Sequence, residues 1–258
     1  MLLMVVIICS VVLAADLPVW LLLVSNRWQA SRLGEIPVLK GFERDRVGEG
    51  SYAHFIRQLP IKKRGAWVHL FSGKLDRHLR LSTAVIDMQL LSNSEQCANV
   101  PMRLMAEYLW SQGRHNEIVF HDNPGNVLQY CGEGGREDIE AYLRHVFDWC
   151  NTSSLVAETV PCDLRQVRAG DVFVYTAGSR EGQRYGHAVM VADVAHDSKG
   201  RAALMLVEGN TPAREIHIMR QRNPLRNPWI IVDDNTQQLR FPYCYFTRDE
   251  LRRYSWMG

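Results

Sequence analysis

Two early segments of the chain alternate apolar and polar residues. In residues 66–71 and 82–88, apolar residues recur at about every second position, with β-branched side chains among them. Successive side chains on a strand point to opposite faces, so this period of two predicts half-buried strands. We expect the folded core to begin near Phe55, just before these strands.

A helical period replaces the strand period further along the chain. In residues 97–110 and again in residues 137–149, apolar positions lie three and four residues apart. That spacing places apolar side chains on one face of a helix. Ser92, Asn93 and Ser94 precede the first of these helices as capping candidates. The first helix is therefore expected to begin at or near Cys97.

Short apolar runs typical of strands dominate the rest of the chain. They cover residues 117–121, 171–175, 187–194, 203–207, 216–219, 229–232 and 239–246, and a short helix is expected over 247–254. A turn-forming sequence at 196–201 lies between two of the runs and predicts a hairpin. Early helices followed by an antiparallel sheet indicate the α+β class.

The first 24 residues differ in kind from the remainder. Residues 2–15 carry no charge, and a second apolar run follows Asp16 as far as Val24. This pattern predicts a signal peptide or membrane anchor over residues 1–25, with residues 2–24 as the segment that would attach to a membrane. A buried N-terminal helix is the alternative. The folded part is then expected outside the cytoplasm, as a secreted, periplasmic or membrane-anchored domain.

Composition and charge exclude several classes of protein. Of the 258 residues, 47% are hydrophobic and 22% are charged, which suffices for one large or two small folded domains. The net charge of +2 is spread without a basic stripe, so nucleic acid is not an expected partner. No cysteine pair has Cys-x-x-Cys spacing, and His69, His121 and His217 lack metal-ligand spacing. We expect no metal and no cofactor, and we expect core or surface roles for these histidines.

Five cysteines follow the N-terminal segment, and one of them has the position of a nucleophile. In an oxidising compartment four of the five would allow two disulfides in three connectivities; the five are Cys97, Cys131, Cys150, Cys162 and Cys244. At a helix N-terminus, unpaired N–H groups and the positive end of the dipole stabilise a thiolate. Cys97 is therefore the candidate nucleophile, with the side-chain amide of Gln96 as a candidate donor to an oxyanion.

A base and an acid are predicted from the strand that begins at residue 187 and the hairpin that follows it. His187 opens this apolar strand directly after Gly186, whose missing side chain leaves room beside the ring. A hairpin turn centred between Asp197 and Ser198 would place Glu208 opposite His187. A centre one residue later would place Asn210 there instead. Either residue can orient the imidazole, because both point to the same face of the strand.

This order of residues resembles the NlpC/P60 and CHAP branches of the papain-like cysteine hydrolase superfamily. The resemblance rests on a Cys at a helix start, a Gly-Asp before a strand, a Gly-His that opens the next strand, and a Glu-x-Asn that closes the hairpin. It implies that Cys97 is the nucleophile, His187 the base, and Glu208 with Asn210 the polar pair that follows. It also implies a papain-like fold in which a helix that carries the nucleophile packs on an antiparallel sheet.

The sequence is more closely similar to a bacterial family named only as domain of unknown function 4846. The similarity runs from about Phe55 to Trp256, and the position of Glu208 resembles a Gln in that family. The similar stretches are Leu59–Lys62, Gln96–Ala98, Arg103–Leu109, Gly170–Phe173, Gly186–Val189 and Pro212–Ala213.

These resemblances imply a cysteine amidase or peptidase. Its domain plan is residues 1–25 as the signal or anchor, 26–54 as a linker and lead-in segment, and 55–258 as a papain-like catalytic domain. The implied reaction cleaves an amide of peptidoglycan or a related peptide, or runs the reverse acyl transfer, through a thioester on Cys97. The rival expectation is a non-catalytic secreted or envelope module that binds a peptide or partner on the same fold. A wall-degrading effector would share the chemistry and differ in context.

Overall fold

The computed structural model of the chain describes residues 25–77 and 82–257. The segment predicted as a signal peptide or membrane anchor lies outside these residues, except for Ser25. Among the helices of the described ranges, none has both the length and the apolar character needed to cross a bilayer.

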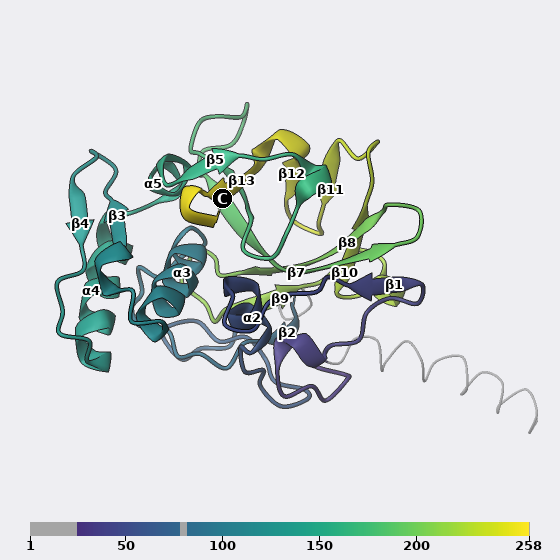
Figure 1. The fold of residues 1–258 in the computed structure, drawn as a ribbon, viewed down its shortest axis with the longest axis horizontal. Coiled ribbons are helices and arrows are strands. Elements are labelled where there is room, and N and C mark those ends of the chain that lie inside the picture. The colour runs from purple at the N-terminus through teal and green to yellow at the C-terminus, as the bar shows by residue number, and fades with distance from the viewer. Residues whose placement is uncertain (1–24, 78–81, 258) are drawn as a thin grey trace, which may run out of the picture.

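A nine-stranded sheet forms the centre of the described structure (Figure 1). Its order is β2-β9-β8-β7-β6-β13-β5, with β1 also paired to β7 and β10 also paired to β8, and its strand pairs are antiparallel. The strands are β1 (Phe42–Arg44), β2 (Ser82–Val85), β5 (Thr159–Pro161), β6 (Val172–Tyr175), β7 (His187–Asp197), β8 (Ala202–Glu208), β9 (His217–Met219), β10 (Trp229–Val232) and β13 (Leu251–Tyr254).

Two smaller hairpins and several helices surround this sheet. The hairpins pair β3 (Val119–His121) with β4 (Val127–Gln129) and β11 (Gln238–Arg240) with β12 (Tyr245–Thr247). The α-helices are α2 (Tyr52–Arg57), α3 (Asn99–Ser111), α4 (Arg136–Trp149) and α5 (Thr152–Ala157). The 3-10 turns are η1 (Leu33–Glu35), η2 (His115–Glu117), η3 (Leu164–Gln166), η4 (Pro224–Arg226), η5 (Arg248–Glu250) and η6 (Ser255–Met257). The α+β class predicted from the sequence is thereby confirmed.

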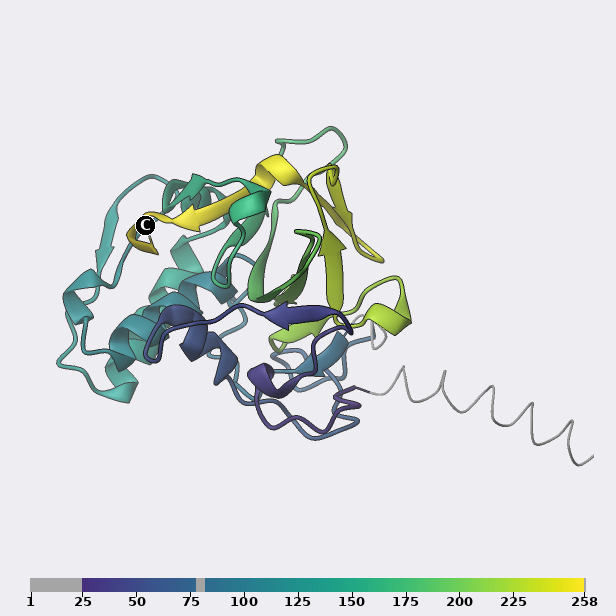
Figure 2. The same cartoon turned by 45° about the vertical axis from the view of Figure 1, so that its right-hand side comes forward.

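The helices α3 and α4 and the β3–β4 hairpin gather on one side of the molecule, beside the central sheet (Figures 1 and 2). The β11–β12 hairpin lies on the other side of β7. The sheet therefore separates a helical half of the molecule from a strand-rich half.

Strand β7 lies between two hydrophobic cores and contributes to both. Met190 and Ala192 belong to the core that includes α3, whereas Val189 and Val191 belong to the core that includes the β11–β12 hairpin. Alternate side chains of a strand point to opposite faces, so a strand covered on both faces is apolar at nearly every position. This explains the continuous apolar run at the start of β7.

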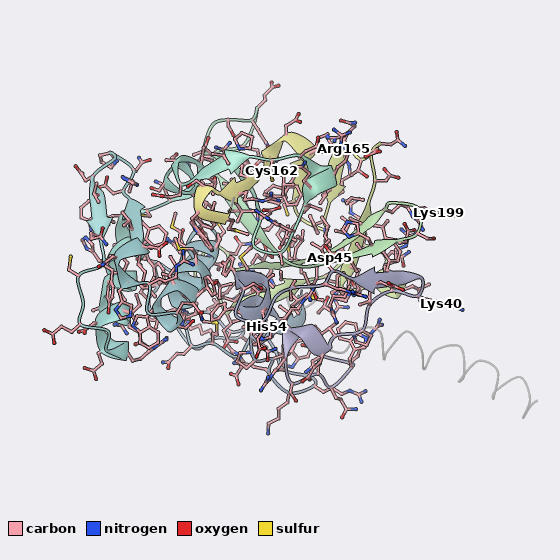
Figure 3. All side chains as sticks on the ribbon, in the orientation of Figure 1. Lys40, Asp45, His54, Cys162, Arg165 and Lys199 are labelled. Atoms are coloured by element: carbon pink, nitrogen blue, oxygen red, sulfur yellow. The ribbon has the colours of Figure 1, made fainter. Side chains whose placement is uncertain are left out.

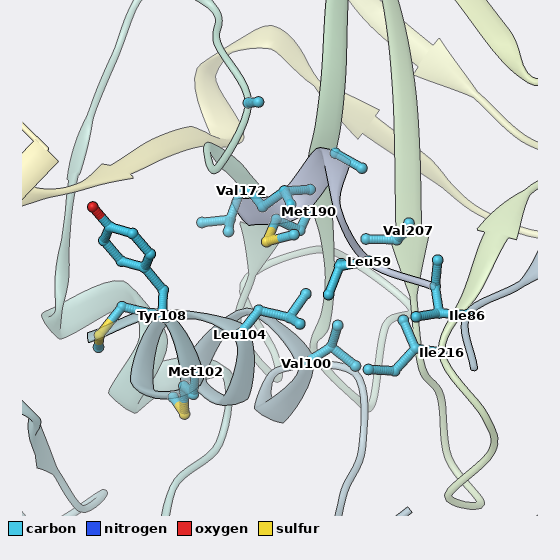
Figure 4. Packing of buried hydrophobic residues seen from close by; sticks show 14 of the residues in the cluster. Leu59, Ile86, Val100, Met102, Leu104, Tyr108, Val172, Met190, Val207 and Ile216 are labelled. Carbon is cyan, nitrogen blue, oxygen red and sulfur yellow. The ribbon is translucent and has the colours of Figure 1, made fainter. Parts of the chain in front are cut away.

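Helix α3 presents one apolar stripe to the sheet. Val100, Leu104 and Tyr108 recur every four residues, and Figure 4 shows Val100 and Leu104 directed toward Met190 and Val207 of the sheet. Removing a leucine-sized side chain from water contributes about 1.5–3 kcal/mol. The helix ends just before Gly113, whose φ of +68° is a left-handed conformation that glycine adopts readily.

The segment expected as a linker, residues 26–54, is instead part of the folded domain. Strand β1 pairs with the end of β7, and Leu33 is buried in the main core. Arg44 of β1 and Arg57 of α2 both bind the buried carboxylate of Asp193 in β7, at 2.6 and 2.7 Å. Strand pairing, apolar burial and the Arg44 ion pair thus all attach this segment to the domain.

Three local predictions in the sequence were wrong. Residues 66–71 form isolated bridges rather than a strand. Residues 239–246 are interrupted by a turn, since Pro242 cannot donate a ladder hydrogen bond. Residues 247–254 were expected to be helical, yet they contain η5 and then β13. Leu251 and Tyr254 are buried by pairing with β6 and β5, and such tertiary contacts override a local helical spacing.

Candidate active site

Cys97 lies two residues before the start of α3, in the turn that leads into the helix. Its side chain is 7% exposed and lines a cleft of about 640 Å3 between the helical half and the loop before β7. Other residues that line this cleft include Asn123, Asp148 and Gly186. The sulfur thus lies at the boundary between the interior and a space large enough for a small substrate.

The turn that carries Cys97 is held by hydrogen bonds on both sides of it. The N–H of Gln96 donates to Oδ1 of Asn99 at 2.9 Å, and the N–H of Asn99 donates to the carbonyl of Gln96 at 3.0 Å. Behind the turn, the buried carboxylate of Glu95 binds Arg103 of α3 at 2.6 Å. Helix α3 has no side-chain cap, and these contacts hold the backbone of the turn against the start of the helix.

His187 is the first residue of β7 and pairs with Tyr175 of β6. Its ring stacks on Phe246 at a centroid separation of 5.8 Å and is 7% exposed. The preceding Gly186 is required by close packing, because a Cβ there would lie 2.3 Å from Oγ1 of Thr152 and 2.7 Å from the carbonyl oxygen of Tyr175. The room that the sequence analysis attributed to this glycine is filled by α5 and β6.

Glu208, the last residue of β8, contacts the far side of the His187 ring. Its Oε2 lies 3.1 Å from Nε2 of His187, and its side chain is 1% exposed. Asn210, the alternative third member, turns away and accepts a hydrogen bond from the N–H of Thr211 at 2.8 Å. Of the two candidates, Glu208 is therefore the one that contacts the imidazole.

Beside the site, the β7–β8 register is the second of the two that the sequence suggested, because the pairing of Met190 with Val207, continued along both strands, places position 210 opposite His187. His196 pairs with Ala202, so the turn is centred on Lys199, which projects from the tip of the hairpin (Figure 3). A register shift between Val191 and Asp193 then pairs Met190 with Val207. Glu208 consequently reaches His187 diagonally along one face rather than from the position directly opposite, a distance that a long side chain spans.

The charges in the site favour an ionised Cys97–His187 pair. Burial tends to raise the pKa of the Cys97 thiol, but a hydrogen bond from His187, the charge of that ring and the N–H of Ala188 outweigh burial and lower it. Burial tends to lower the pKa of His187, yet contacts with Cys244, Cys97 and Glu208 raise it well above its ordinary value. The lowered pKa of Cys97 favours the thiolate, and the raised pKa of His187 favours the imidazolium beside it.

Glu208 stays ionised despite its burial. Burial works to raise the pKa of its carboxyl group, but hydrogen bonds from His187 and His217 bring the pKa below its ordinary value. Since Nε2 of His187 faces this carboxylate, Nδ1 is the ring nitrogen left for the thiol.

A second thiol, Cys244, also contacts the His187 ring. It follows Tyr243 in the turn between β11 and β12, and its hydrogen bond to His187 is among the contacts that raise the pKa of the ring. Burial raises the pKa of the Cys244 thiol, and the imidazole offsets this only in part. The opposite shifts of the two thiols favour Cys97 as the one that ionises. The sequence did not predict Cys244 here, because the strand expected over residues 239–246 left no turn to bring the thiol to the ring.

Gln96, the predicted oxyanion donor, lines the same cleft as Cys97. Its Oε1 accepts a hydrogen bond from Oγ1 of Thr211 at 2.8 Å, and both residues line the cleft. Since Oε1 binds Thr211, the Nε2 group is the part of the Gln96 side chain that is left to donate to an oxyanion.

His217 of β9 is a further site residue that the sequence analysis missed. Its Nε2 lies 3.2 Å from Oε1 of Glu208, and its side chain is 2% exposed. Strand β9 pairs with β8 so that Glu208 and His217 are cross-strand partners. The apolar run at 216–219 predicted a strand, but its neighbour in the sheet was not evident from the sequence.

The five cysteines within the described residues are all free thiols in this structure. Cys97 therefore retains a sulfur that can react. Across residues 25–77 and 82–257, no group of three or more His, Cys, Asp or Glu side chains is arranged to hold a metal ion.

Comparison with known proteins identifies the family of the chain. Residues 34–134 and 131–253 match the family described as Domain of unknown function (4846). The chain belongs to this family. The match begins within the segment expected as a linker, and it includes Cys97, His187 and Glu208. None of the curated proteins and none of the solved structures matches the chain.

Proposed function

We propose that this protein is a cysteine amidase or peptidase that forms a thioester on Cys97, on a fold of the papain-like NlpC/P60 and CHAP type. The observation that carries the proposal is the position of the His187 ring, which is close enough to the Cys97 thiol to lower its pKa and contacts the Glu208 carboxylate. A nucleophile, a base within hydrogen-bond reach and a third group that orients the base form the arrangement of covalent hydrolases.

In the first half of the reaction, the Cys97 thiolate attacks the carbonyl carbon of an amide. The carbonyl π electrons move to oxygen, where we expect the side-chain amide of Gln96 and the N–H groups at the start of α3 to bind the negative charge. Nδ1 of His187 gives its proton to the amide nitrogen, the C–N bond breaks, and the amine leaves.

In the second half, water replaces the amine. Nδ1 of His187 takes a proton from water as the water oxygen attacks the thioester carbon. The C–S bond then breaks, which restores the Cys97 thiolate and the imidazolium and releases a carboxylic acid. Glu208 stays ionised throughout and keeps Nε2 of the ring as a donor.

The cleft supports a peptide-like substrate. Its lining is rich in neutral hydrogen-bonding side chains, and the lining residues carry one charged group, Asp148. Peptide amides are matched by such donors and acceptors. The resemblance to cell-wall hydrolases extends the proposal to peptidoglycan peptides as substrates, and to a domain that acts outside the cytoplasm after export through residues 2–24.

Cys97→Ala tests the proposal when it is compared with Cys131→Ser, a change at an exposed thiol away from the cleft. Short peptides and a peptidoglycan digest are incubated with each protein, and new amino groups are detected by mass spectrometry. Labelling by iodoacetamide is mapped to each cysteine in parallel.

We expect Cys97→Ala to abolish hydrolysis and Cys131→Ser to leave it unchanged, and we expect Cys97 to be alkylated faster than Cys131 at pH 6–7. Hydrolysis that survives in Cys97→Ala would refute the proposal. An unreactive Cys97 together with tight binding of an uncleaved peptide would favour the rival function, a binding module.

A further inference from the structure

Glu208 accepts hydrogen bonds from two histidines, one on each carboxylate oxygen. Oε2 lies 3.1 Å from Nε2 of His187, and Oε1 lies 3.2 Å from Nε2 of His217. All three side chains are buried. A carboxylate bound on one oxygen alone can rotate about its last bond, whereas one bound on both oxygens cannot do so without breaking a contact.

His217 is itself held in place by the backbone. Its Nδ1 lies 3.0 Å from the carbonyl oxygen of Glu215, two residues earlier. A carbonyl oxygen only accepts, and an ionised carboxylate only accepts, so both contacts are satisfied at once when both ring nitrogens carry a proton. The neighbouring strand β2 places the apolar Val85 at the position paired with His217, so Glu208 from β8 is its charged partner.

The four side chains Cys97, His187, Glu208 and His217 form a continuous buried chain of contacts that leads from the cleft into the sheet. A buried carboxylate is costly unless it is paired and hydrogen-bonded, and a second donor reduces that cost for Glu208.

We propose that His217 is a positioning residue of the Cys97 site. It binds Oε1 of Glu208, the oxygen that His187 does not contact, and so holds the carboxylate in the orientation that anchors the His187 ring. The inference rests on the proposed function, because it gives His217 a role only if Cys97 and His187 act as a reactive pair. His217 touches neither the thiol nor the cleft.

Two substitutions separate the contacts of His217. In His217→Gln, the side-chain amide nitrogen lies near the position of Nε2, so a donor to Glu208 is retained and the backbone contact is lost. In His217→Asn, the amide nitrogen lies near the position of Nδ1, so the backbone contact is retained and Glu208 loses a donor. The two variants differ by one methylene group and have the same polarity.

The readout is the second-order rate of Cys97 alkylation by iodoacetamide between pH 5 and 9, followed by peptide mapping. Loss of a hydrogen bond to a charged group is expected to slow alkylation at pH 6 by about 10- to 100-fold in His217→Asn. His217→Gln is expected to stay within about threefold of the parent rate. His196→Gln, which breaks the 2.6 Å contact of a half-exposed histidine with Asp45 at the other end of β7, is the matched control and is expected to change nothing.

Equal rates in His217→Asn and the parent protein would overturn the inference, and so would an equal loss in both His217 variants. A further measurement needs no substitution: nitrogen NMR of the parent protein is expected to show a proton on Nε2 of His217, the nitrogen that faces Glu208. A neutral His217 with an unprotonated Nε2 toward Glu208 would overturn it as well. If Cys97 of the parent protein reacts no faster than Cys131, the proposed function is wrong. If Cys97 reacts fast in the parent protein and equally fast in His217→Asn, only the inference about His217 is wrong.

Discussion

Nε2 of His187 lies 3.1 Å from Oε2 of Glu208, across 21 residues of sequence and a diagonal of the β7–β8 hairpin. The contact connects the first residue of one strand with the last residue of the next. Because both strands are buried along most of their length, the separation is set by the sheet and not by a loop. The third group of the candidate site is therefore fixed as firmly as the core.

Glu208→Gln is expected to lower the rate of amide hydrolysis by about 100-fold or more, since a neutral amide neither stabilises the imidazolium nor keeps its tautomer. Asn210→Ala is the control, because Asn210 bonds the backbone of Thr211 and not the ring. Steady-state kinetics on the same substrate compare the two. A larger loss in Asn210→Ala than in Glu208→Gln would show that the amide, not the acid, supports His187.

Cys97 is expected to remain reactive at pH values where an ordinary thiol is protonated. The lowered pKa of Cys97 means that its thiolate is lost only when the pH falls below the usual thiol range, near 8.5. The raised pKa of His187 means that the imidazolium is lost only well above pH 6.5 or so. When the alkylation rate of Cys97 is plotted against pH, its midpoint should lie at a lower pH than that of an ordinary thiol.

His187→Gln removes the cause of this shift, so the midpoint of Cys97 alkylation is expected to move upward by more than about one pH unit. Hydrolysis by the parent protein should follow a bell-shaped profile between the two ionisations. An alkylation midpoint in the parent protein at or above that of His187→Gln would contradict the ion pair.

Cys244→Ser is expected to retain hydrolysis, although Cys244 shares the His187 ring with Cys97. The raised pKa of Cys244 leaves it protonated at neutral pH, so it does not act as the nucleophile. Thiol labelling at pH 6–7 should be lost in Cys97→Ser and kept in Cys244→Ser. Labelling that is lost in Cys244→Ser and kept in Cys97→Ser would identify Cys244 as the reactive thiol.

Gly186→Ala is expected to destabilise the protein by about 1–3 kcal/mol and to displace His187, because the added methyl group meets Oγ1 of Thr152 and the backbone of Tyr175. Gly48→Ala is the matched control, since a Cβ there meets nothing within 4 Å and its φ is not left-handed. Urea unfolding measures the stability change, and alkylation of Cys97 reports the displacement. Equal stability of the two variants would show that α5 and β6 move enough to accommodate the added methyl group without loss of stability.

Asp193→Ala is expected to lower the free energy of unfolding by about 3–5 kcal/mol, because it leaves Arg44 and Arg57 without their buried partner. Asp163→Ala breaks an exposed ion pair with Arg165 and should have no comparable effect. Urea denaturation of both variants provides the comparison. A similar, small change in the two would show that the segment around β1 is held by apolar contacts instead.

The sequence predicted those parts of the fold that depend on local periodicity. The spacing of Val100, Leu104 and Tyr108 placed α3 within two residues of its observed start, and the apolar run after His187 predicted β7. Both signals are strong because each element is buried along a regular face. The same patterns predicted that Cys97, His187 and either Glu208 or Asn210 would meet at one site.

Features that depend on long-range pairing were not evident in the sequence. The partner of β9 decides that His217 meets Glu208, and the turn at Pro242 decides that Cys244 meets His187. The Asp193 cluster similarly joins β7 to residues almost 150 positions earlier, at Arg44. No local pattern encodes such contacts, because they arise when sheet order and register are established.

Cys97 lies in the turn before a helix, and His187 is the first residue of a strand in the central sheet. During synthesis the thiol leaves the ribosome long before the imidazole, and it behaves as an ordinary cysteine until β7 docks beside α3. A partly synthesised chain therefore has a Cys97 thiol of ordinary pKa, because the imidazole that lowers this pKa is added to the chain later.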